Sequence, residues 1–171
     1  MFYAEGIRAV GVDAIIARAA VAKASFYKYF PSKDDLVVAY LERRDEMWRR
    51  WLEESVDRLA KSAAARPLAV FDALAERFAT ADFRGCAFIN SMAELADRGH
   101  AAHVAAALHK QKLTAFLRKL LAEAGVADPD PLAEQFMILI DGSIVTALRK
   151  GDPAAAKAAR QIAAMLLRGA A

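Results

Sequence analysis

Residues 12–30, VDAIIARAAVAKASFYKYF, are followed at once by PSKDDL at residues 31–36. In the first half of this stretch apolar side chains recur every three or four residues, at Val12, Ile15, Ile16 and Ala19. This spacing predicts one apolar stripe on a helix about two turns long. After a turn at residues 20–21, Phe26 and Phe30 share one face of a second short helix. Two short helices joined by a tight turn predict a helix-turn-helix, whose second helix enters the major groove of DNA.

Residues 19–33, AAVAKASFYKYFPSK, resemble the recognition segment of the tetracycline-repressor (TetR) family of transcriptional regulators. The family pattern runs roughly Ala-Gly-Val-Ser-Lys-Gly-Thr-Leu-Tyr-Arg-His-Phe-Pro-Ser-Lys, and the likeness covers about the first forty residues. This chain departs from it at Ala20, where Gly is usual, at Ala22, where Ser usually caps the recognition helix, and at Tyr29, where His is common. An alanine cap loses about 0.5–2 kcal/mol of helix stability relative to serine. We therefore expect the recognition helix to depend on the packing of Phe26 and Phe30.

The resemblance implies a fold and a function. The expected fold is all-α, with a DNA-binding helix-turn-helix domain at residues 1–38 and a helical ligand-sensing and dimerisation domain at residues 39–171. The implied protein is a repressor that binds a palindromic double-stranded DNA operator as a homodimer and is released by a small-molecule effector. The first helix of the family's DNA-binding domain is incomplete here, because the chain starts close to Gly6, its predicted C-terminal cap. A helical homodimer that binds a small molecule or protein partner without DNA therefore stays an alternative.

Roles in DNA binding are implied residue by residue. Lys23 and Ala24 match positions that face base edges in the family, whereas Ser25, Tyr27, Tyr29 and Lys33 match positions that usually contact phosphates. The full DNA-binding set is Lys23, Ala24, Ser25, Tyr27, Lys28, Tyr29 and Lys33. Phosphate contacts give affinity and register, whereas base-edge contacts give sequence choice. The alternative is that the lysines are ordinary solvated cations and the tyrosines simply pack.

A long helix is predicted directly after the recognition helix. Ser32 with Asp35 three residues later predicts a capping box that starts it. Its apolar pattern continues to about Leu59. Lys33 would then lie in its first turn, where the backbone amides of a helix N-terminus also favour a phosphate.

Composition sets broad limits. A hydrophobic share of 57%, with 8 Gly and 5 Pro in 171 residues, favours an all-helical fold. The net charge of +3 is too mild to establish nucleic-acid binding by itself. The single cysteine precludes an intrachain disulfide and fits a reducing cytoplasm. There is no signal peptide, and we expect no apolar stretch near the ~20 residues of a membrane span.

Two helices at the end of the chain predict a dimer. The segment from Leu132 to Leu148 is apolar on two sides, which requires cover on two sides. The segment from Pro153 to Arg168 repeats small residues that allow close helix approach. We expect the pair to form half of a four-helix bundle completed by a second copy, although a purely intrachain core is the alternative.

Candidate sites in the larger domain are less specific. An effector pocket is expected among Trp51, Phe71, Phe78, Phe88, Asn90, Met92 and Phe116. Most of these side chains are expected to be core, and Asn90 needs a hydrogen-bond partner whether or not a ligand provides it. A metal site is disfavoured although five possible ligands follow one another, Glu94, Asp97, His100, His103 and His109. Cys86 is expected to be a buried structural thiol. No active-site motif is present, so neither catalysis nor a cofactor is expected.

Overall fold

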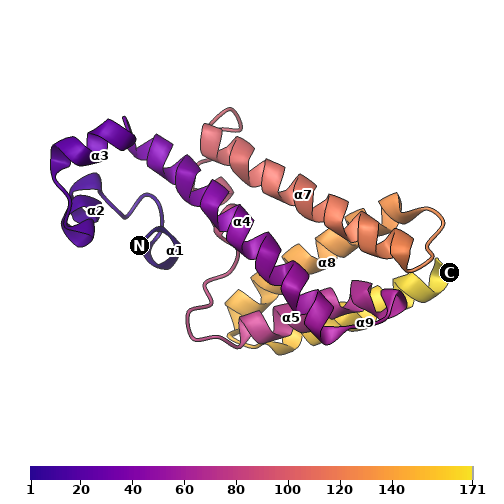
Figure 1. Ribbon diagram of the computed structural model, residues 1–171. Coiled ribbons are helices and arrows are strands. Elements are labelled where there is room, and N and C mark those ends of the chain that lie inside the picture. The colour runs from indigo at the N-terminus through magenta and orange to yellow at the C-terminus, as the bar shows by residue number, and fades with distance from the viewer. Residues whose placement is uncertain (171) are drawn as a thin grey trace. The chain divides into compact units, whose positions relative to one another are not determined.

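The computed structural model describes residues 1–170, and within them every regular element is helical. The all-α prediction is confirmed. The helices, shown in Figure 1, are α1 (Phe2–Glu5), α2 (Val12–Ala19), α3 (Lys23–Tyr29), α4 (Lys33–Leu59), the 3-10 turn η1 (Ala63–Ala65), α5 (Arg66–Phe78), α6 (Ala87–Glu94), α7 (Ala101–Glu123), α8 (Pro129–Lys150) and α9 (Ala154–Gly169).

The helices form two compact units. The first unit comprises residues 1–46 and 86–109, and the second comprises residues 47–85 with the chain from Lys110 onward. Helices α4 and α7 each contribute to both units. The first unit therefore holds the helix-turn-helix together with α6 and the start of α7. The division into a DNA-binding domain to residue 38 and a sensing domain beyond it stays a prediction about function.

A small hydrophobic cluster supports the first unit. Its buried members are Ile7, Val37, Leu41, Phe88, Ala102 and Ala106, which come from the α1–α2 turn, α4, α6 and α7. Phe2 and Tyr40 add an edge-to-face contact with ring centroids 5.5 Å apart. The Arg44 guanidinium lies 4.1 Å from the ring centroid of Tyr3. Although α1 has only four residues, its two aromatic side chains thus hold it against α4.

The turn after α1 is fixed by a carboxylate from the end of α6. Gly6 caps α1 as predicted, with φ 96° and ψ 154°, a conformation that is essentially restricted to glycine. A Cβ at this position would lie 3.3 Å from both carboxylate oxygens of Glu94. The Arg8 backbone N–H donates a hydrogen bond of 2.8 Å to Glu94 Oε2. Glu94 thus holds the α1–α2 turn in place through the backbone.

A buried polar pair links α4 and α7 inside the first unit. His109 Nδ1 lies 2.8 Å from Asp45 Oδ1, and both side chains are almost completely buried. The His109 ring stacks on Phe88 at a centroid distance of 3.6 Å and an interplanar angle of 8°. Because neither side chain reaches bulk water, the hydrogen bond between them replaces part of the hydration that each group loses on burial.

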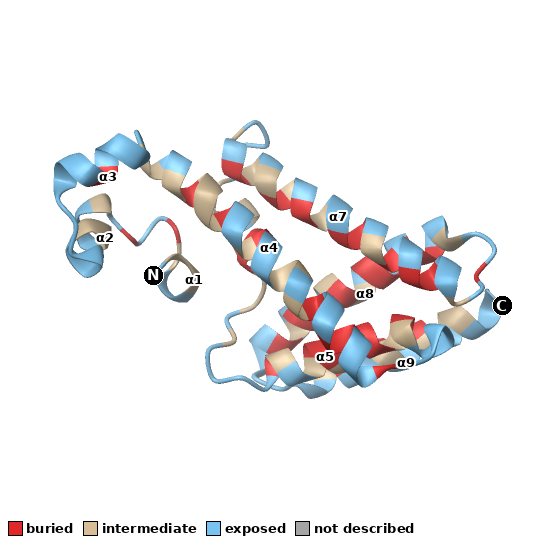
Figure 2. Cartoon of the chain, in the orientation of Figure 1, coloured by how far each residue is buried: buried red, intermediate tan, exposed pale blue. Residues whose placement is uncertain are grey.

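The second unit packs α5 against α9 and α8 against α9. Phe71 of α5 meets Phe136 of α8 edge to face, with centroids 5.5 Å apart, and both are fully buried. Figure 2 shows buried residues on α5, α8 and α9 with exposed positions on their other faces. Pro67 lies in the first turn of α5, as predicted from the sequence.

Helix α8 is more apolar than the sequence analysis anticipated. Its 22 residues are long and apolar enough to cross a membrane by length and composition alone, with a mean hydropathy of 1.3 in the most apolar window. Of that window, 44% is buried inside the chain. A helix buried on one side and apolar on another also fits a protein core that continues into a partner, so the composition of α8 is weak evidence for a membrane.

Two residues between α2 and α3 are unfavourable for the local backbone, Ala20 in the turn and Ala22 at the helix cap. Ala20 adopts the left-handed conformation with φ 53° and ψ 40°, which costs a residue with a Cβ roughly 1–2 kcal/mol. Ala22 occupies the N-cap of α3 and supplies no side-chain hydrogen bond. The sequence departures at these two positions therefore weaken the local structure, as expected.

We predict that Ala20→Gly and Ala22→Ser each protect the amides of α3 against hydrogen exchange. For Ala20→Gly, the free energy of opening α3 should rise by about 0.5–1 kcal/mol, because the larger unfolded-state entropy of glycine offsets part of the strain that it removes. For Ala22→Ser, the new cap should raise it by about 1 kcal/mol. Ala17→Gly, inside α2, should instead accelerate exchange, and Ala24→Ser should give no gain. If Ala17→Gly protected α3 as well as Ala20→Gly does, or Ala24→Ser as well as Ala22→Ser does, the turn and cap geometry would be contradicted.

We predict that Asp45→Ala lowers the free energy of unfolding by about 2–4 kcal/mol, because His109 is left buried without its carboxylate. Urea denaturation measures the change. Glu42→Ala, at an exposed position one turn earlier on α4, should alter stability by less than about 0.5 kcal/mol. A similar loss in both variants would show that helix propensity, not the buried pair, is responsible.

Candidate nucleic-acid interface

Helix α3 is held by one buried side chain. Phe26 is 5% exposed and lies between Tyr27, at a ring-centroid distance of 5.2 Å, and Phe30, at 5.8 Å. The predicted pairing of Phe26 with Phe30 is therefore confirmed. The remainder of α3 faces solvent, as Figure 2 shows. A seven-residue helix with one buried anchor presents the rest of its surface to a partner.

The residues predicted to contact DNA are accessible. Six of them are exposed, Lys23, Ala24, Ser25, Tyr27, Lys28 and Tyr29, while Lys33 is half-buried. Tyr29 is 72% exposed, with Lys28 Nζ 5.9 Å from its ring centroid. An exposed aromatic ring beside a cation suits a phosphodiester backbone better than a protein core. Its exposure argues against a packing role for Tyr29, whereas Tyr27 does pack against Phe26.

Lys23 differs from a simple solvated cation. Its Nζ lies 3.1 Å from Asp13 Oδ1 of α2, although both side chains are largely exposed, at 65% and 85%. The hydrogen bond with Asp13 and its negative charge raise the pKa of Lys23 above its ordinary value. Sequence analysis missed Asp13 because the pair joins two helices, where the spacing rules of a single helix do not apply. An acidic residue in the first turn of α2 was the available signal.

The N-terminus of α4 begins as the capping box predicts. The Ser32 backbone N–H donates to Asp35 Oδ2 at 2.9 Å, and the Asp35 backbone N–H donates to Ser32 Oγ at 3.2 Å. The Ser32 hydroxyl also donates to Asp35 Oδ2, at 2.7 Å. Asp34 Oδ2 lies 3.3 Å from His100 Nε2. Both carboxylates of this first turn are therefore engaged, which leaves Lys33 as the side chain that would meet an anion.

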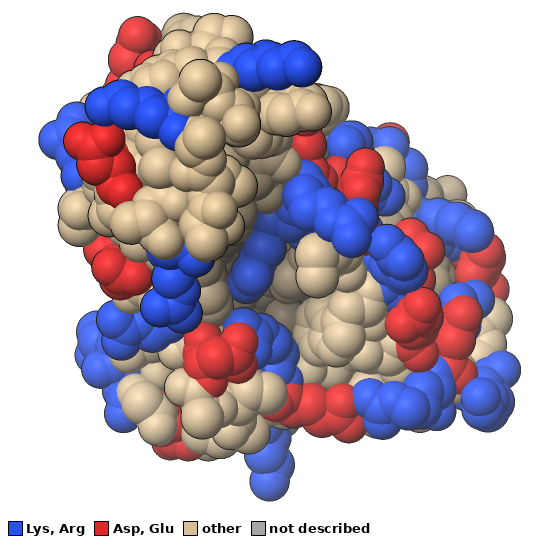
Figure 3. Space-filling model, turned by 60° about the vertical axis from the view of Figure 1, so that its left-hand side comes forward, with Lys and Arg blue, Asp and Glu red and all other residues tan. Residues whose placement is uncertain are grey.

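The face of the molecule shown in Figure 3 carries charged side chains of both signs. On the face shown in Figure 3, Lys and Arg side chains alternate with Asp and Glu. This agrees with the net charge of +3 from 24 basic and 21 acidic residues. Affinity for a polyanion would therefore depend on the local placement of the α3 and α4 cations.

The predicted effector residues are distributed over both units. Phe88, Asn90 and Met92 lie on α6 in the first unit, and the other four lie in the second unit. Three of the seven are buried in aromatic contacts, Phe71 with Phe136, Phe78 with Phe83 and Phe88 with His109. The remaining four, Trp51, Asn90, Met92 and Phe116, are half-buried. An effector could reach these four with less rearrangement than the three buried rings.

The two other candidate sites from the sequence are the possible metal ligands and Cys86. Among residues 1–170, no group of three or more His, Cys, Asp or Glu side chains could hold a metal ion. His100 and His109 instead pair with Asp34 and Asp45. Cys86 is half-buried at the N-cap of α6, so it is less enclosed than the sequence suggested.

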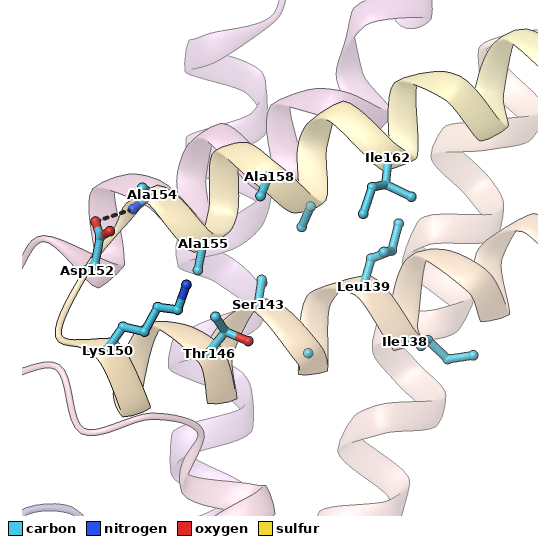
Figure 4. Close-up of a pocket in the computed structure, with 12 residues that line it drawn as sticks. Ile138, Leu139, Ser143, Thr146, Lys150, Asp152, Ala154, Ala155, Ala158 and Ile162 are labelled. Carbon is cyan, nitrogen blue, oxygen red and sulfur yellow. Dashed lines mark hydrogen bonds between the residues drawn. The ribbon is translucent and has the colours of Figure 1, made fainter.

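A groove lies between α8 and α9 in the second unit. Its volume is about 520 Å³, and its walls carry mostly small and apolar residues. In Figure 4, Leu139 and Ile162 point toward each other across it. At one end the Ala154 backbone N–H donates to Asp152 Oδ1 at 2.8 Å. Ile138 lines the groove and is exposed, and the same two helices carry further exposed apolar side chains, Val145, Leu148 and Met165.

Comparisons with known proteins agree with this arrangement. The family described as "Bacterial regulatory proteins, tetR family" matches residues 1–40. Transcriptional regulator AcuR of Cereibacter sphaeroides is 36% identical over 152 residues, which cover 84% of this chain and 69% of AcuR.

Solved structures agree over almost the whole chain. The crystal structure of SCO4454, a TetR-family transcriptional regulator from Streptomyces coelicolor, matches with a TM-score of 0.89 at 32% identity, over 99% of this chain and 89% of that one. Escherichia coli NemR in its reduced form has a TM-score of 0.85 at 22% identity, over 95% and 88% of the two chains, and shows a likeness of fold alone. These similarities, together with the exposed helix-turn-helix, show that this chain belongs to the TetR family of DNA-binding transcriptional regulators.

Proposed function

We propose that this protein is a repressor in the cytoplasm that binds a palindromic operator as a homodimer and is released by a small-molecule effector. The observation that carries the proposal is the recognition helix α3, anchored by Phe26 and otherwise exposed, with Lys23 at its first position. Such a helix has the size and chemistry to enter the major groove.

Two kinds of DNA contact follow from the placement of the cations. Lys23 comes from the N-terminal end of α3, the end from which recognition helices contact base edges. Lys33 lies in the first turn of α4, where the partial positive charge of the helix N-terminus also favours a phosphate. We therefore assign base selection to Lys23 and phosphate binding to Lys33, with the exposed tyrosines of α3 as further phosphate partners.

The dimer is proposed to form through the α8–α9 surface. Ile138, which lines the groove between the two helices, is 72% exposed, and Met165 of α9 is 62% exposed. Exposed apolar patches of this kind mark association sites. A second copy related by two-fold symmetry would cover the same residues on both chains, and a two-fold dimer matches a palindromic operator.

The effector is proposed to bind in the second unit, beside the half-buried pocket residues Trp51 and Phe116. The ring of Trp51 lies 5.8 Å from that of Trp48. Since these are the two tryptophans of the chain, intrinsic fluorescence would report on a ligand near this part of α4. An effector is recognised as a compound that also raises the Kd for the operator.

Lys23→Ala should relax base preference, whereas Lys33→Ala should weaken binding to all sequences about equally. A base contact contributes about 1–3 kcal/mol of discrimination, and the loss of a phosphate contact lowers the salt slope by about one unit. Selection from a random duplex pool followed by mobility-shift titration at several salt concentrations measures both quantities. Identical changes in the two variants would refute the division of roles, and failure of the wild-type chain to select any sequence would favour the alternative without DNA binding.

Ile138→Asp and Met165→Asp should each shift the protein from dimer to monomer in sedimentation, because each places a charge in the proposed apolar interface. Ile144, on the same helix as Ile138, is unsuitable as an interface probe, since it is only 6% exposed within one chain and its replacement would disturb the core. Val104→Asp, at an exposed position on α7, is the control and should stay dimeric. An unchanged sedimentation profile for both interface variants would place the dimer elsewhere.

A further inference from the structure

We propose that Asp13 limits the sequence selectivity of this regulator by competing with DNA for the Lys23 side chain. The inference rests on the proposed base contact of Lys23. Its starting observation is the 3.1 Å ion pair between Asp13 of α2 and Lys23 of α3, which lies on the exposed surface of the helix-turn-helix. With the pair closed, the ammonium group that would reach a base edge is already occupied.

The pair has a physical reason to form before DNA arrives. Lys23 is the first residue of α3, where the partial positive charge of the helix N-terminus disfavours a cation. Ala22, at the N-cap, offers no side-chain oxygen to offset this. Asp13 lies in the first turn of α2, where an anion is favoured, and its carboxylate supplies negative charge to the start of α3 as well. The Asp13 carboxylate thus offsets the partial positive charge at the N-termini of both α2 and α3.

The consequence for DNA differs between sequences. A guanine offers Lys23 two acceptors, O6 and N7, that can replace the Asp13 carboxylate as a hydrogen-bond partner. A base without that pattern leaves Lys23 paired with Asp13, so no ion pair is lost. The correct sequence must break the pair and leave the Asp13 carboxylate unpaired near the phosphates, so Asp13 costs the correct sequence more than an incorrect one and limits the selectivity.

The test uses the full chain and four variants, Asp13→Asn, Asp13→Glu, Lys23→Ala and the double variant Asp13→Asn with Lys23→Ala. Asp13→Asn removes the charge and keeps an acceptor, while Asp13→Glu keeps the charge. Glu42→Gln is the control, because it removes one negative charge at an exposed position of α4 in the same unit. Each protein is titrated against two probes, the duplex selected by the wild-type chain from a random pool and a scrambled duplex of the same composition. Thermal unfolding is recorded for each protein.

Asp13→Asn should strengthen binding to the selected duplex by about three- to five-fold, since exposed ion pairs are weak, and to the scrambled duplex by less. The ratio of the affinity for the selected duplex to that for the scrambled duplex should therefore rise, and the salt slope should steepen because Lys23 is free to meet phosphate. Asp13→Glu should restore the ratio. In the Lys23→Ala background the Asp13→Asn change should leave the ratio unaltered, which the double-mutant cycle tests directly.

The inference is overturned if Asp13→Asn leaves the ratio unchanged, if Glu42→Gln raises it equally, or if the effect persists without Lys23. A fall in thermal stability with both affinities reduced together would assign Asp13 a structural role and overturn it as well. If the wild-type chain selects no sequence, the proposed operator binding fails and this inference fails with it. If the wild-type chain does select a sequence but Asp13→Asn leaves the ratio of the two affinities unchanged, only the proposed role of Asp13 is overturned.

Discussion

The DNA-reading helices depend on hydrophobic contacts made by residues next to them. Isolated helices of eight and seven residues are too short to form in water. Helix α2 buries no residue completely, and α3 buries only Phe26. The buried anchors nearby are Ile7 and Val10, in the turn before α2, and Ile7 belongs to the cluster that also contains Phe88 of α6. The geometry of the recognition helix is therefore set largely by packing outside the helix-turn-helix.

The same dependence explains why Gly6 and Glu94 matter although neither faces a proposed DNA contact. Gly6 permits a backbone conformation that brings the α1–α2 turn against the end of α6, and the Glu94 carboxylate accepts the Arg8 backbone N–H there. A hydrogen bond between a charged acceptor and a backbone donor is stronger than one between neutral groups. The turn that precedes α2 is thus tied to a helix 86 residues away in the sequence.

The sequence predicted features whose causes are local. The Ser32–Asp35 capping box, the Gly6 cap and the Phe26–Phe30 pair all depend on spacing within one segment, and the structure confirms each of them. Features between segments were missed, because no spacing rule relates Asp13 to Lys23 or His109 to Asp45. The candidate effector pocket was the weakest prediction for the same reason. Aromatic residues at helical spacing indicate burial, but they do not distinguish a packed ring such as Phe71 from one that a ligand could reach.

Helices α8 and α9 leave an apolar surface in solvent that the rest of the chain does not cover. Helix α8 buries Phe136, Ile140 and Ile144 on one side, yet Ile138 and Val145 remain in solvent on another. On α9, the small residues Ala156, Ala159 and Ala163 are buried against neighbouring helices, whereas Ile162 and Met165 remain exposed. Apolar area left in water is unfavourable by about 25 cal/mol per Å². Selection for a soluble monomer would place polar residues at these positions, so their apolar character is better explained by an association that removes the same surface from water in two chains at once.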